Sequence, residues 1–505
     1  MDYIWHPEIR NHVVQMLPFE TLIIIDKDLP APAYMQVVNG IVNLVKDGVI
    51  QKGALIPGTR SMAGMIKLHR KTVVAAYNEL IAQGWLTALA KHGHYIAVDL
   101  PEAGIRQWGQ SKDGFLSGSK MKSPFFKLET VKEFHPHPSS PGPSLIIDDG
   151  HPDTRLAPMH LLNREYLSRL KQQHVKKKPA ITLAPGSLKL RDTMVGYLAK
   201  TRGINADVTN ILITHGAQMS IFIAASLLLK RGSYVIVAEP GYHVANYVFD
   251  YLGARIIRIP VDRDGIDTDL LKRACEKYKV SALYLIPHHH YPTTVTLSPE
   301  RRAVILNIAE QFNFSIIEDD YDYGFQYTSS PYLPLAGSNH HNRVIYVGSF
   351  SKSLSTSIRI GFMVAASDFI EQAVYLRKII ELKGDNIMED SLSALIDNGD
   401  IARHLKKVNK VFAQRRDYLC ALLHQKLADV VSFTQPEGGL ALWTVFSKKY
   451  PLENISVKAA KQGLFINDGK IFNHAGSSYN ALRFGFASLN EQEMDEAIHI
   501  IYRCL

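Results

Sequence analysis

The sequence is poor in cysteine and has no long uninterrupted apolar run. Its 505 residues include three cysteines, Cys275, Cys420 and Cys504, which lie far apart and show no C-x-x-C spacing. This excludes a disulfide framework and a cysteine-based zinc site, and is typical of reduced thiols. The N-terminus lacks a basic region followed by an apolar stretch, and the run Leu22–Ile25 is too short to span a bilayer. We therefore expect a cytoplasmic protein that does not enter a membrane.

Acidic residues are fewer than basic ones, 48 against 57, which leaves a net charge of +9. An excess of this size permits nucleic-acid binding, but surface lysines alone can supply it. The distribution of the charge is more informative. Residues 51–95 contain a single acid, Glu79, and a basic set made up of Lys52, Arg60, Lys67, Arg70, Lys71 and Lys91. Such a window is typical of a surface that faces phosphates.

The length predicts at least two domains, and the sequence divides into three zones. Residues 15–100 alternate helical patterns with short strands and form the first domain. Residues 101–145 are proline-rich with little periodicity, which predicts a linker. Residues 146–505 alternate short apolar runs with helical stretches. This pattern predicts an α/β domain with a mainly parallel sheet, helices on both faces and a smaller C-terminal α+β region.

Specific segments carry these expectations in the second domain. The expected strands of the main sheet are 210–214, 234–238, 255–260, 282–286, 315–318 and 344–347. A long helix is expected over 400–427, and two later strands are expected at 440–445 and 481–486.

The first domain contains three helical patterns and a hairpin. Helices are expected at 34–46, from Thr59 onward with Thr59 or Ser61 as the cap, and at 70–83, followed by a hairpin within 85–98. This order predicts a winged helix-turn-helix, whose recognition helix places its first residues against bases and phosphates. By composition alone, a small accessory domain with merely solvated basic residues fits nearly as well.

Three motifs in this domain resemble the GntR-type winged helix. They are Ile56-Pro-Gly-Thr-Arg60, His69-Arg-Lys-Thr-Val-Val-Ala-Ala-Tyr77 and Leu80-Ile-Ala-Gln-Gly-Trp-Leu86. The resemblance implies that three parts of the domain approach DNA. These are Arg60, the start of the third helix with Arg70 and Thr72, and the glycine-containing wing at Gly93. The candidate DNA-binding residues are Arg60, Arg70, Lys71, Thr72, Lys91 and Gly93.

One segment of the second domain carries reactive chemistry, Gly348-Ser-Phe-Ser-Lys-Ser-Leu-Ser-Thr-Ser-Ile-Arg-Ile-Gly361. The amine of Lys352 can condense with an aldehyde. Ser349, Ser351 and Arg359 can hold a phosphate close to that amine. The segment therefore suits a Schiff-base lysine.

Two further segments point to a flat, phosphorylated ligand. The motif Thr214-His-Gly-Ala-Gln-Met-Ser220 follows a strand and opens a helix, so that the amides of Ala217 and Gln218 form an anion cradle. Taken alone it is also an ordinary strand-to-helix turn. Tyr242 follows a Pro-Gly turn and can stack on a flat ring, although a tyrosine of the core would look the same.

Two other segments place charge in apolar surroundings. The motif Ile316-Ile-Glu-Asp-Asp-Tyr-Asp322 ends a buried strand in four acids, which are costly unless they serve a cation or ligand. One carboxylate facing a pyridine nitrogen would keep it protonated. A metal competes with this interpretation, but no histidine or cysteine lies in the motif, so no metal is expected. Arg483 lies in an apolar strand and needs a carboxylate, from an effector or from a structural ion pair.

In order and spacing, these five segments resemble a fold-type-I, pyridoxal-phosphate-dependent aminotransferase domain. Together with the first domain they resemble the MocR subfamily of GntR-type regulators. The resemblance implies that Lys352 forms the internal aldimine with pyridoxal 5'-phosphate, Asp319 pairs with the pyridine nitrogen, Tyr321 bonds the ring hydroxyl and Tyr242 stacks. It assigns the phosphate to Ala217, Gln218, Ser349, Ser351 and Arg359, and an effector carboxylate to Arg483.

Departures from the family pattern surround this pocket. Thr294 stands where glycine is usual, His290 where glutamine is common, Ser355-Thr-Ser357 where Ala-Pro-Gly is usual, and Ala441 where histidine is common. They bear on the effector and on efficient transamination more than on cofactor binding.

The resulting hypothesis is a transcription regulator that binds pyridoxal phosphate, senses that molecule or an amino compound, and acts on a double-stranded DNA operator as a homodimer. Catalysis is then not the main role, although residual transamination is compatible with it. The alternative is a genuine aminotransferase with an accessory domain, which the basic N-terminal module disfavours. A third alternative, a scaffold that has lost the cofactor, is disfavoured by Lys352, Asp319 and Arg359.

Overall fold

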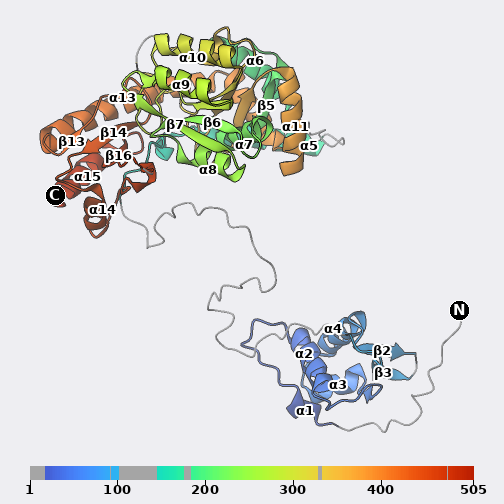
Figure 1. Cartoon of the computed structure of the whole chain (residues 1–505). Helices are drawn as coiled ribbons and strands as arrows, with labels where there is room; N and C mark the ends of the chain where they lie inside the picture. Colours follow the sequence, from blue (N-terminus) through green and yellow to red (C-terminus); the bar gives the residue numbers. More distant parts are fainter. Residues whose placement is uncertain (1–16, 91, 102–144, 176–183, 328–331, 475) are drawn as a thin grey trace. The chain divides into compact units, whose positions relative to one another are not determined.

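The computed structural model describes residues 17–90, 92–101, 145–175, 184–327, 332–474 and 476–505. The chain forms two compact units, Met1–Glu129 and Thr130–Leu505, whose helices and strands are labelled in Figure 1. The expected linker, 101–145, lies outside the described residues except for its two end positions. Each unit is described separately below.

The first unit is built around one apolar core. Helix α2 (Ala33–Lys46) buries Val38, Ile41, Val42 and Val45 on one side, as the 3.6-residue spacing of these side chains predicts. The helix packs on α4, which in turn packs on α3, and a short turn of helix, α1, precedes it. The helices of the unit are α1 (Phe19–Leu22), α2, α3 (Thr59–Met65) and α4 (Arg70–Ala82).

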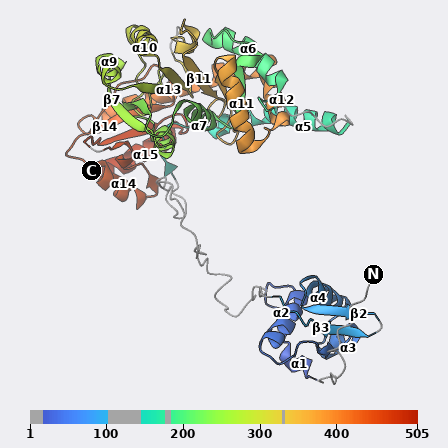
Figure 2. The same cartoon turned by 45° about the vertical axis from the view of Figure 1, so that its right-hand side comes forward.

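A small antiparallel sheet completes the first unit, in the order β1-β3-β2, with β1 (Leu55–Ile56), β2 (Leu86–Leu89) and β3 (Gly93–Ile96). The hairpin pairs Leu86 with Ile96 and Leu89 with Gly93. Gly93 has a φ of +107°, which side chains other than glycine rarely adopt. Three helices followed by this hairpin form the predicted winged helix-turn-helix, which is visible in Figure 2.

The start of α3 differs from the prediction. Gly58 is the residue that precedes the helix, and no side chain caps it. Thr59 and Ser61 lie inside the helix, so their expected capping role is wrong. Helix α4 does have a side-chain cap, because the Nδ1 atom of His69 accepts a hydrogen bond from the amide of Lys71 at 3.2 Å.

The second unit contains an eight-stranded sheet, in the order β5-β12-β11-β10-β9-β6-β7-β8. Its strands are β5 (Ile211–Thr214), β6 (Tyr234–Glu239), β7 (Arg255–Asp262), β8 (Gly265–Ile266), β9 (Val280–Leu285), β10 (Ser315–Asp320), β11 (Val344–Ser349) and β12 (Gly361–Val364). All six expected strands are present. Strand β12 was not predicted, and it runs antiparallel to both of its neighbours, β5 and β11. The five consecutive strands of the sheet from β11 to β7, in the order β11-β10-β9-β6-β7, are all parallel to one another.

Helices cover both faces of this sheet, as predicted (Figures 1 and 2). Successive strand residues point to opposite faces, so Val235 and Val237 join one core cluster while Ile236 joins another. The first face is covered by α7 (Ala217–Leu228), α8 (His243–Tyr251) and α11 (Ser367–Glu381). The second face is covered by α5 (Met159–Val175), α6 (Leu188–Arg202), α9 (Thr268–Lys277), α10 (Pro299–Phe312) and α12 (Asn386–Asp397).

A smaller α+β region follows, as predicted. Its three-stranded antiparallel sheet has the order β13-β14-β16, and the long helix α13 covers the expected residues 400–427. Its elements are α13 (Asp400–Leu427), β13 (Val431–Ser432), β14 (Ala441–Phe446), α14 (Leu452–Ala460), β16 (Ala481–Gly485) and α15 (Glu491–Arg503). A two-stranded parallel pair, β4 (Leu145–Ile146) with β15 (Leu464–Phe465), joins the start of the unit to this region.

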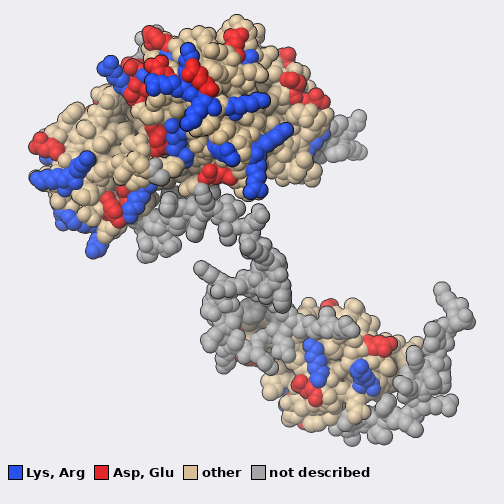
Figure 3. Space-filling view, viewed as in Figure 1, with Lys and Arg blue, Asp and Glu red and all other residues tan. Residues whose placement is uncertain are grey.

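Short 3-10 turns complete the second unit, namely η2 (Thr154–Leu156), η3 (Val208–Asn210), η4 (Leu335–Gly337) and η5 (Lys470–Phe472). On the face shown in Figure 3, lysine and arginine side chains are interspersed with acids over this unit. Within the described ranges, no helix combines the length and the apolar character that crossing a membrane requires.

Candidate functional site

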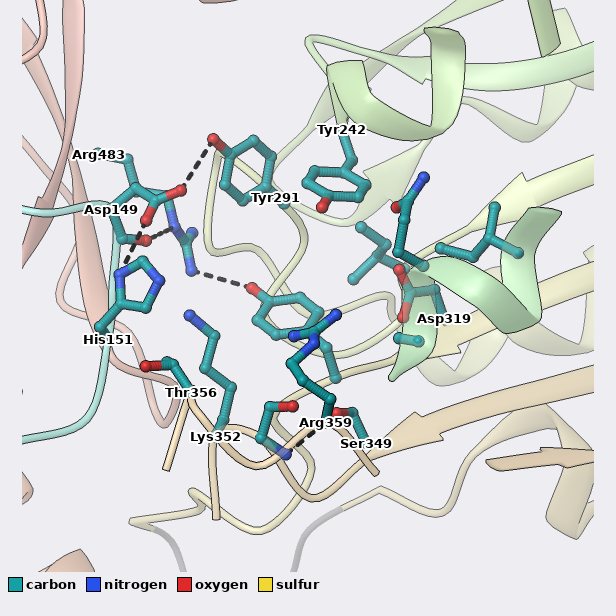
Figure 4. Close-up of a pocket in the computed structure, with 16 residues that line it drawn as sticks. Asp149, His151, Tyr242, Tyr291, Asp319, Ser349, Lys352, Thr356, Arg359 and Arg483 are labelled. Carbon is teal, nitrogen blue, oxygen red and sulfur yellow. Dashed lines mark hydrogen bonds and ion pairs between the residues drawn. The ribbon is translucent and has the colours of Figure 1, made fainter. Parts of the chain in front are cut away.

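A cavity of about 250 Å³ lies at the carboxyl ends of the parallel strands of the large sheet (Figure 4). In such sheets ligands bind at this edge, because loops and helix N-termini converge there. Every residue that the sequence assigned to the cofactor or the effector lines this one cavity: Ala217, Gln218, Tyr242, Asp319, Tyr321, Ser349, Ser351, Lys352, Arg359 and Arg483. The structure therefore brings together residues from the five separate segments.

Lys352 follows β11 and projects into the middle of the cavity (Figure 4). Its Nζ atom donates a hydrogen bond to the carbonyl oxygen of Gly150 at 2.9 Å. Burial lowers the pKa of the amine below its ordinary value, although the charges of Asp149 and Asp148 act in the opposite direction. A lowered pKa increases the fraction of neutral amine, which is the form that attacks a carbonyl carbon.

Asp319, near the end of β10, lies buried at the opposite end of the cavity from Arg483 (Figure 4). Its Oδ2 atom accepts a hydrogen bond from the hydroxyl of Tyr284 at 2.6 Å. Its Oδ1 atom is buried and has no hydrogen-bond partner among the described residues. A buried carboxylate oxygen without a donor is costly, so this atom is suited to a protonated ring nitrogen.

The phosphate end of the cavity is formed where β5 leads into α7. Gly216, at the start of α7, has a φ of +84°, and a Cβ atom there would lie 2.7 Å from the guanidinium of Arg359. Strand β12 pairs Gly361 with Thr214, and this pairing brings Arg359 against the N-terminus of α7. Helix amides and a guanidinium then face the same space, which is a suitable arrangement for a phosphate dianion.

The two serines have other partners in this structure. The hydroxyl of Ser351 donates to the carbonyl of Ile358 at 2.8 Å, and the Oγ atom of Ser349 accepts from the amide of Ser351 at 3.1 Å. The hydroxyl of Ser349 donates a long hydrogen bond of 3.5 Å to the carbonyl of Ile360. Each serine must therefore give up a backbone carbonyl before its hydroxyl hydrogen can turn toward a ligand, and the longer bond of Ser349 is the weaker of the two.

Arg483 comes from β16, in the smaller region, and is only 1% exposed. It donates to the carbonyl oxygens of Asp149 at 2.7 Å and Pro292 at 3.1 Å, and to the hydroxyl of Tyr321 at 2.9 Å. It forms no ion pair with a carboxylate of the described residues. The structural ion pair that the sequence left open is thus absent from the described part, and the guanidinium still has a positive charge to offer a ligand.

The loop from Asp148 to His151 was not predicted as part of the site. The Oδ1 atom of Asp148 accepts hydrogen bonds from the amides of Gly150 and His151 at 2.8 and 2.9 Å, which holds the loop in a tight turn. As a result, Asp149 and His151 line the cavity, together with Tyr291 and Thr356. A sequence signal existed, because the short apolar run that ends at Ile147 is followed by two acids, a glycine and a histidine, much as β10 ends in acids.

Among the departures from the family pattern, Thr356 lines the cavity, whereas Thr294 and His290 do not. Thr294 adopts a φ of +62°, a conformation that favours glycine and strains a β-branched residue. His290 is buried, and its Nε2 atom lies 2.9 Å from the carbonyl oxygen of Pro240. Burial lowers the pKa of His290 to about 4, so this imidazole is neutral at physiological pH.

The candidate DNA-binding residues belong to the first unit. Arg70 and Lys71 are exposed at the start of α4, Thr72 is half-buried beside them, and Arg60 is exposed on α3. Gly93 opens strand β3, and Lys91 lies outside the described residues. None of the described basic residues of this set pairs with a carboxylate of the described chain, so their charges remain open to a partner.

The buried acid of the cavity predicts a pH dependence of stability. Burial raises the pKa of Asp319 from 3.8 to about 7, while the hydrogen bond from Tyr284 opposes this rise and Asp320 adds to it. The folded state thus binds this proton more tightly than the unfolded chain. Protonation of Asp319 therefore adds to the free energy of unfolding. This contribution is complete below about pH 4 and is lost as the pH rises to about 7.

Asp319→Asn cannot ionise, so we expect the cofactor-free variant to become more stable relative to the wild type between about pH 5 and about pH 8. Urea denaturation of both cofactor-free proteins at these two pH values measures the difference in unfolding free energy. A difference that does not change with pH would show that Asp319 ionises as easily in the folded protein as in the unfolded chain.

Comparison with known proteins agrees with this geometry. Residues 165–501 match the family described as "Aminotransferase class I and II". A solved archaeal alanine:glyoxylate aminotransferase superposes with a TM-score of 0.66 at 26% identity, over 71% of this chain and 90% of that chain. The Pyrococcus horikoshii kynurenine aminotransferase, solved in complex with PMP, superposes with a TM-score of 0.66 at 25% identity over the same shares.

Longer relatives also include the first unit. The HTH-type transcriptional regulator YdfD of Bacillus subtilis (strain 168) is 26% identical over 91% of this chain and 94% of its own length. The probable rhizopine catabolism regulatory protein MocR of Rhizobium meliloti is 24% identical over 95% of this chain and 94% of its own length. The resemblance to MocR-type regulators inferred from the sequence is thereby confirmed, and the chain belongs to the aminotransferase class I and II family.

Proposed function

We propose that this chain is a DNA-binding transcription regulator whose aminotransferase-like domain holds pyridoxal 5'-phosphate and senses it or an amino compound. The observation that carries the proposal is the single cavity that gathers Lys352, Asp319, Arg359 and Arg483 in a chain with a winged helix-turn-helix. The full-length match to HTH-type regulators supports the same combination.

The cavity fits the cofactor by its chemistry. Pyridoxal phosphate supplies an aldehyde that condenses with amines and a ring that withdraws electrons from the bound amine. Lys352 would provide the condensing amine, and the free Oδ1 atom of Asp319 would accept a hydrogen bond from the ring nitrogen. Tyr242, in contact with the side chain of Tyr291 at a ring separation of 5.2 Å, would cover the ring. The hydroxyl of Tyr321, which donates to the carbonyl of His289 at 3.1 Å, would turn to donate to the ring oxygen.

The phosphate would be held at the N-terminus of α7. The amides of Ala217 and Gln218, the hydroxyls of Ser349 and Ser351 and the guanidinium of Arg359 would supply its donors. Arg483 would take the carboxylate of an effector that carries one. Each of these groups would bind or orient the cofactor or the effector without a covalent bond. Among them and Lys352, only Lys352 would form a covalent bond to the cofactor.

A homodimer is part of the proposal. Large apolar side chains are exposed at the end of α11 and just after it, where Ile379 is 81% and Leu382 is 78% exposed. Tyr375, one helical turn earlier, is also exposed. Exposed apolar residues that cluster in this way are typical of a protein interface. A second copy bound there would place two winged helices in one particle, which suits an operator with two half-sites.

DNA binding would use the first unit. Arg60, Arg70 and Lys71 are exposed, and the basic start of α4 matches the docking mode in which a recognition helix presents its first residues to the major groove. Because such contacts neutralise phosphates, affinity for an operator should fall steeply with salt.

Genuine aminotransferase activity is the second candidate function. Buried Arg483, which pairs with no carboxylate among the described residues, lines the same cavity as an amine with a lowered pKa, and this is what an amino-acid substrate would need. This candidate predicts repeated turnover between an amino acid and a keto acid, whereas a sensor needs only a saturable response.

One titration separates the two functions. The full chain, loaded with pyridoxal phosphate, is titrated with amino compounds while visible absorbance, operator affinity and keto-acid release are followed. A saturable absorbance change coupled to a change in operator affinity is expected for the regulator. Turnover of many equivalents of keto acid with no effect on DNA binding would establish the enzyme instead.

A further inference from the structure

At the end of the cavity that contains Arg483, here called the effector end, lies a carboxylate to which none of the proposed cofactor contacts is assigned, that of Asp149. Asp149 lines the cavity beside Lys352 and Arg483, with 47% of its side chain exposed (Figure 4). Its position at the end opposite Asp319 separates it from the pyridine and phosphate contacts. The side chain is therefore available to whatever compound enters beside the cofactor.

The carboxylate of Asp149 is held in place from several directions. Its Oδ2 atom accepts a hydrogen bond from the hydroxyl of Tyr291 at 3.3 Å, and its Oδ1 atom lies 3.2 Å from the Nδ1 atom of His151. Its backbone carbonyl is bonded to Arg483 at 2.7 Å. An acceptor held in this way recognises a donor with little loss of side-chain entropy.

The same carboxylate is negatively charged at neutral pH. Burial raises the pKa of Asp149, but the charges of Lys352, His151 and Arg483 outweigh burial, and the net pKa lies below its ordinary value. In the cofactor-free protein, Lys352 supplies the largest of these favourable charges. While the amine of Lys352 is engaged by the cofactor, Asp149 would lack this positive neighbour, so an arriving ammonium would pair with it. If the effector's other amine then took over the bond to the aldehyde carbon, the bond to Lys352 would break and its amine would be released.

The charges also disfavour a simple acidic effector. A carboxylate placed on Arg483 would lie near the carboxylate of Asp149, and like charges in a partly enclosed site repel each other. A positive group on the same effector removes this conflict, because it pairs with Asp149 while the carboxylate pairs with Arg483.

We propose that the effector carries two amino groups, one that reaches the cofactor at Lys352 and a second ammonium that Asp149 binds. This inference rests on the proposed function and names the chemical class of its ligand. Two classes of compound carry two amino groups, diamino acids and diamines without a carboxylate. A diamino acid would also use Arg483, whereas a diamine without a carboxylate would leave Arg483 with its present backbone partners.

The test uses the full chain loaded with pyridoxal phosphate and bound to its operator. Three diamino acids, L-2,4-diaminobutyrate, L-ornithine and L-lysine, are compared with L-2-aminobutyrate, L-norvaline and L-norleucine, which lack the second amine. Putrescine and cadaverine are compared with butylamine and pentylamine. For each compound, the concentration that gives half of the change in visible absorbance and in operator affinity is measured.

We expect at least one compound with two amino groups to act at a concentration about two- to fivefold lower than its single-amine partner, the size of an ion pair in a half-exposed site. Asp149→Asn keeps the shape of the side chain but removes its charge, and should abolish this preference. Asp264→Asn, an exposed acid remote from the cavity, should retain it. A preference confined to diamino acids or to diamines supports the proposal and identifies the source.

Equal responses to the paired compounds in the wild type, or an unchanged preference in Asp149→Asn, would overturn the inference. So would a complete lack of response in a protein that shows the cofactor absorbance and binds its operator. That last result is distinct from failure of the proposed function, which would appear as loss of the cofactor absorbance or of operator binding before any amine is added.

Discussion

Replacing Lys352 with alanine is expected to abolish the visible absorbance of bound pyridoxal phosphate and the response to amino compounds, while operator affinity is retained. Lys352 offers the only amine placed at the middle of the cavity among the residues that line it. Without that amine the cofactor has no covalent bond to the protein, although Arg359, Asp319 and the N-terminus of α7 can still bind it non-covalently. The DNA-binding residues lie in the other compact unit, which has its own core.

The measurement pairs an absorbance spectrum with an operator-binding titration on the same sample. Lys272→Ala, which removes an exposed lysine of α9 from the same unit, is the matched control and should leave both properties unchanged. If Lys352→Ala lost DNA binding as well as absorbance, then the two units would not act as separable modules. If the spectrum persisted, another amine would be the one that condenses with the aldehyde.

Arg70→Ala is expected to weaken operator binding by about 1–3 kcal/mol without changing the cofactor spectrum. Arg70 is exposed at the first position of α4, the helix that the winged helix-turn-helix presents to DNA, and no described carboxylate pairs with it. Removal of its guanidinium therefore costs a contact with DNA and leaves the fold of the unit intact.

Binding titrations at several salt concentrations reveal which contact is lost. If Arg70 binds a phosphate, the slope of log affinity against log salt should decrease by about one; if it binds a base edge, sequence preference should relax at one position. Lys27→Ala removes the same charge from an exposed site outside the helices and serves as the control. Equal losses in the two variants would mean that only the net charge of the unit matters, and that α4 is not the recognition helix.

Much of the fold was predictable because its signals are local. Buried parallel strands appear in the sequence as apolar runs followed by glycine, proline or acids, and all six expected runs became strands of the large sheet. Strand β12 was missed because it directly follows the phosphate-binding segment, without a clear turn signal between them. The capping of α3 was misassigned because a threonine or serine near a helix start does not reveal whether it precedes the helix or, as with Thr59 and Ser61, lies inside it.

The sequence by itself determined the residue types of the cavity, since lysine, aspartate, arginine and tyrosine occur in short motifs that can be recognised one at a time. Only the tertiary structure decided which backbone atoms and neighbours these side chains meet. Lys352 bonds to Gly150, 202 positions away, and Arg483 bonds to Asp149, 334 positions away. No local pattern records a contact over such separations. The loop that presents Asp149 to the effector end is therefore placed by the packing of distant strands and helices, and its role became visible only in the folded chain.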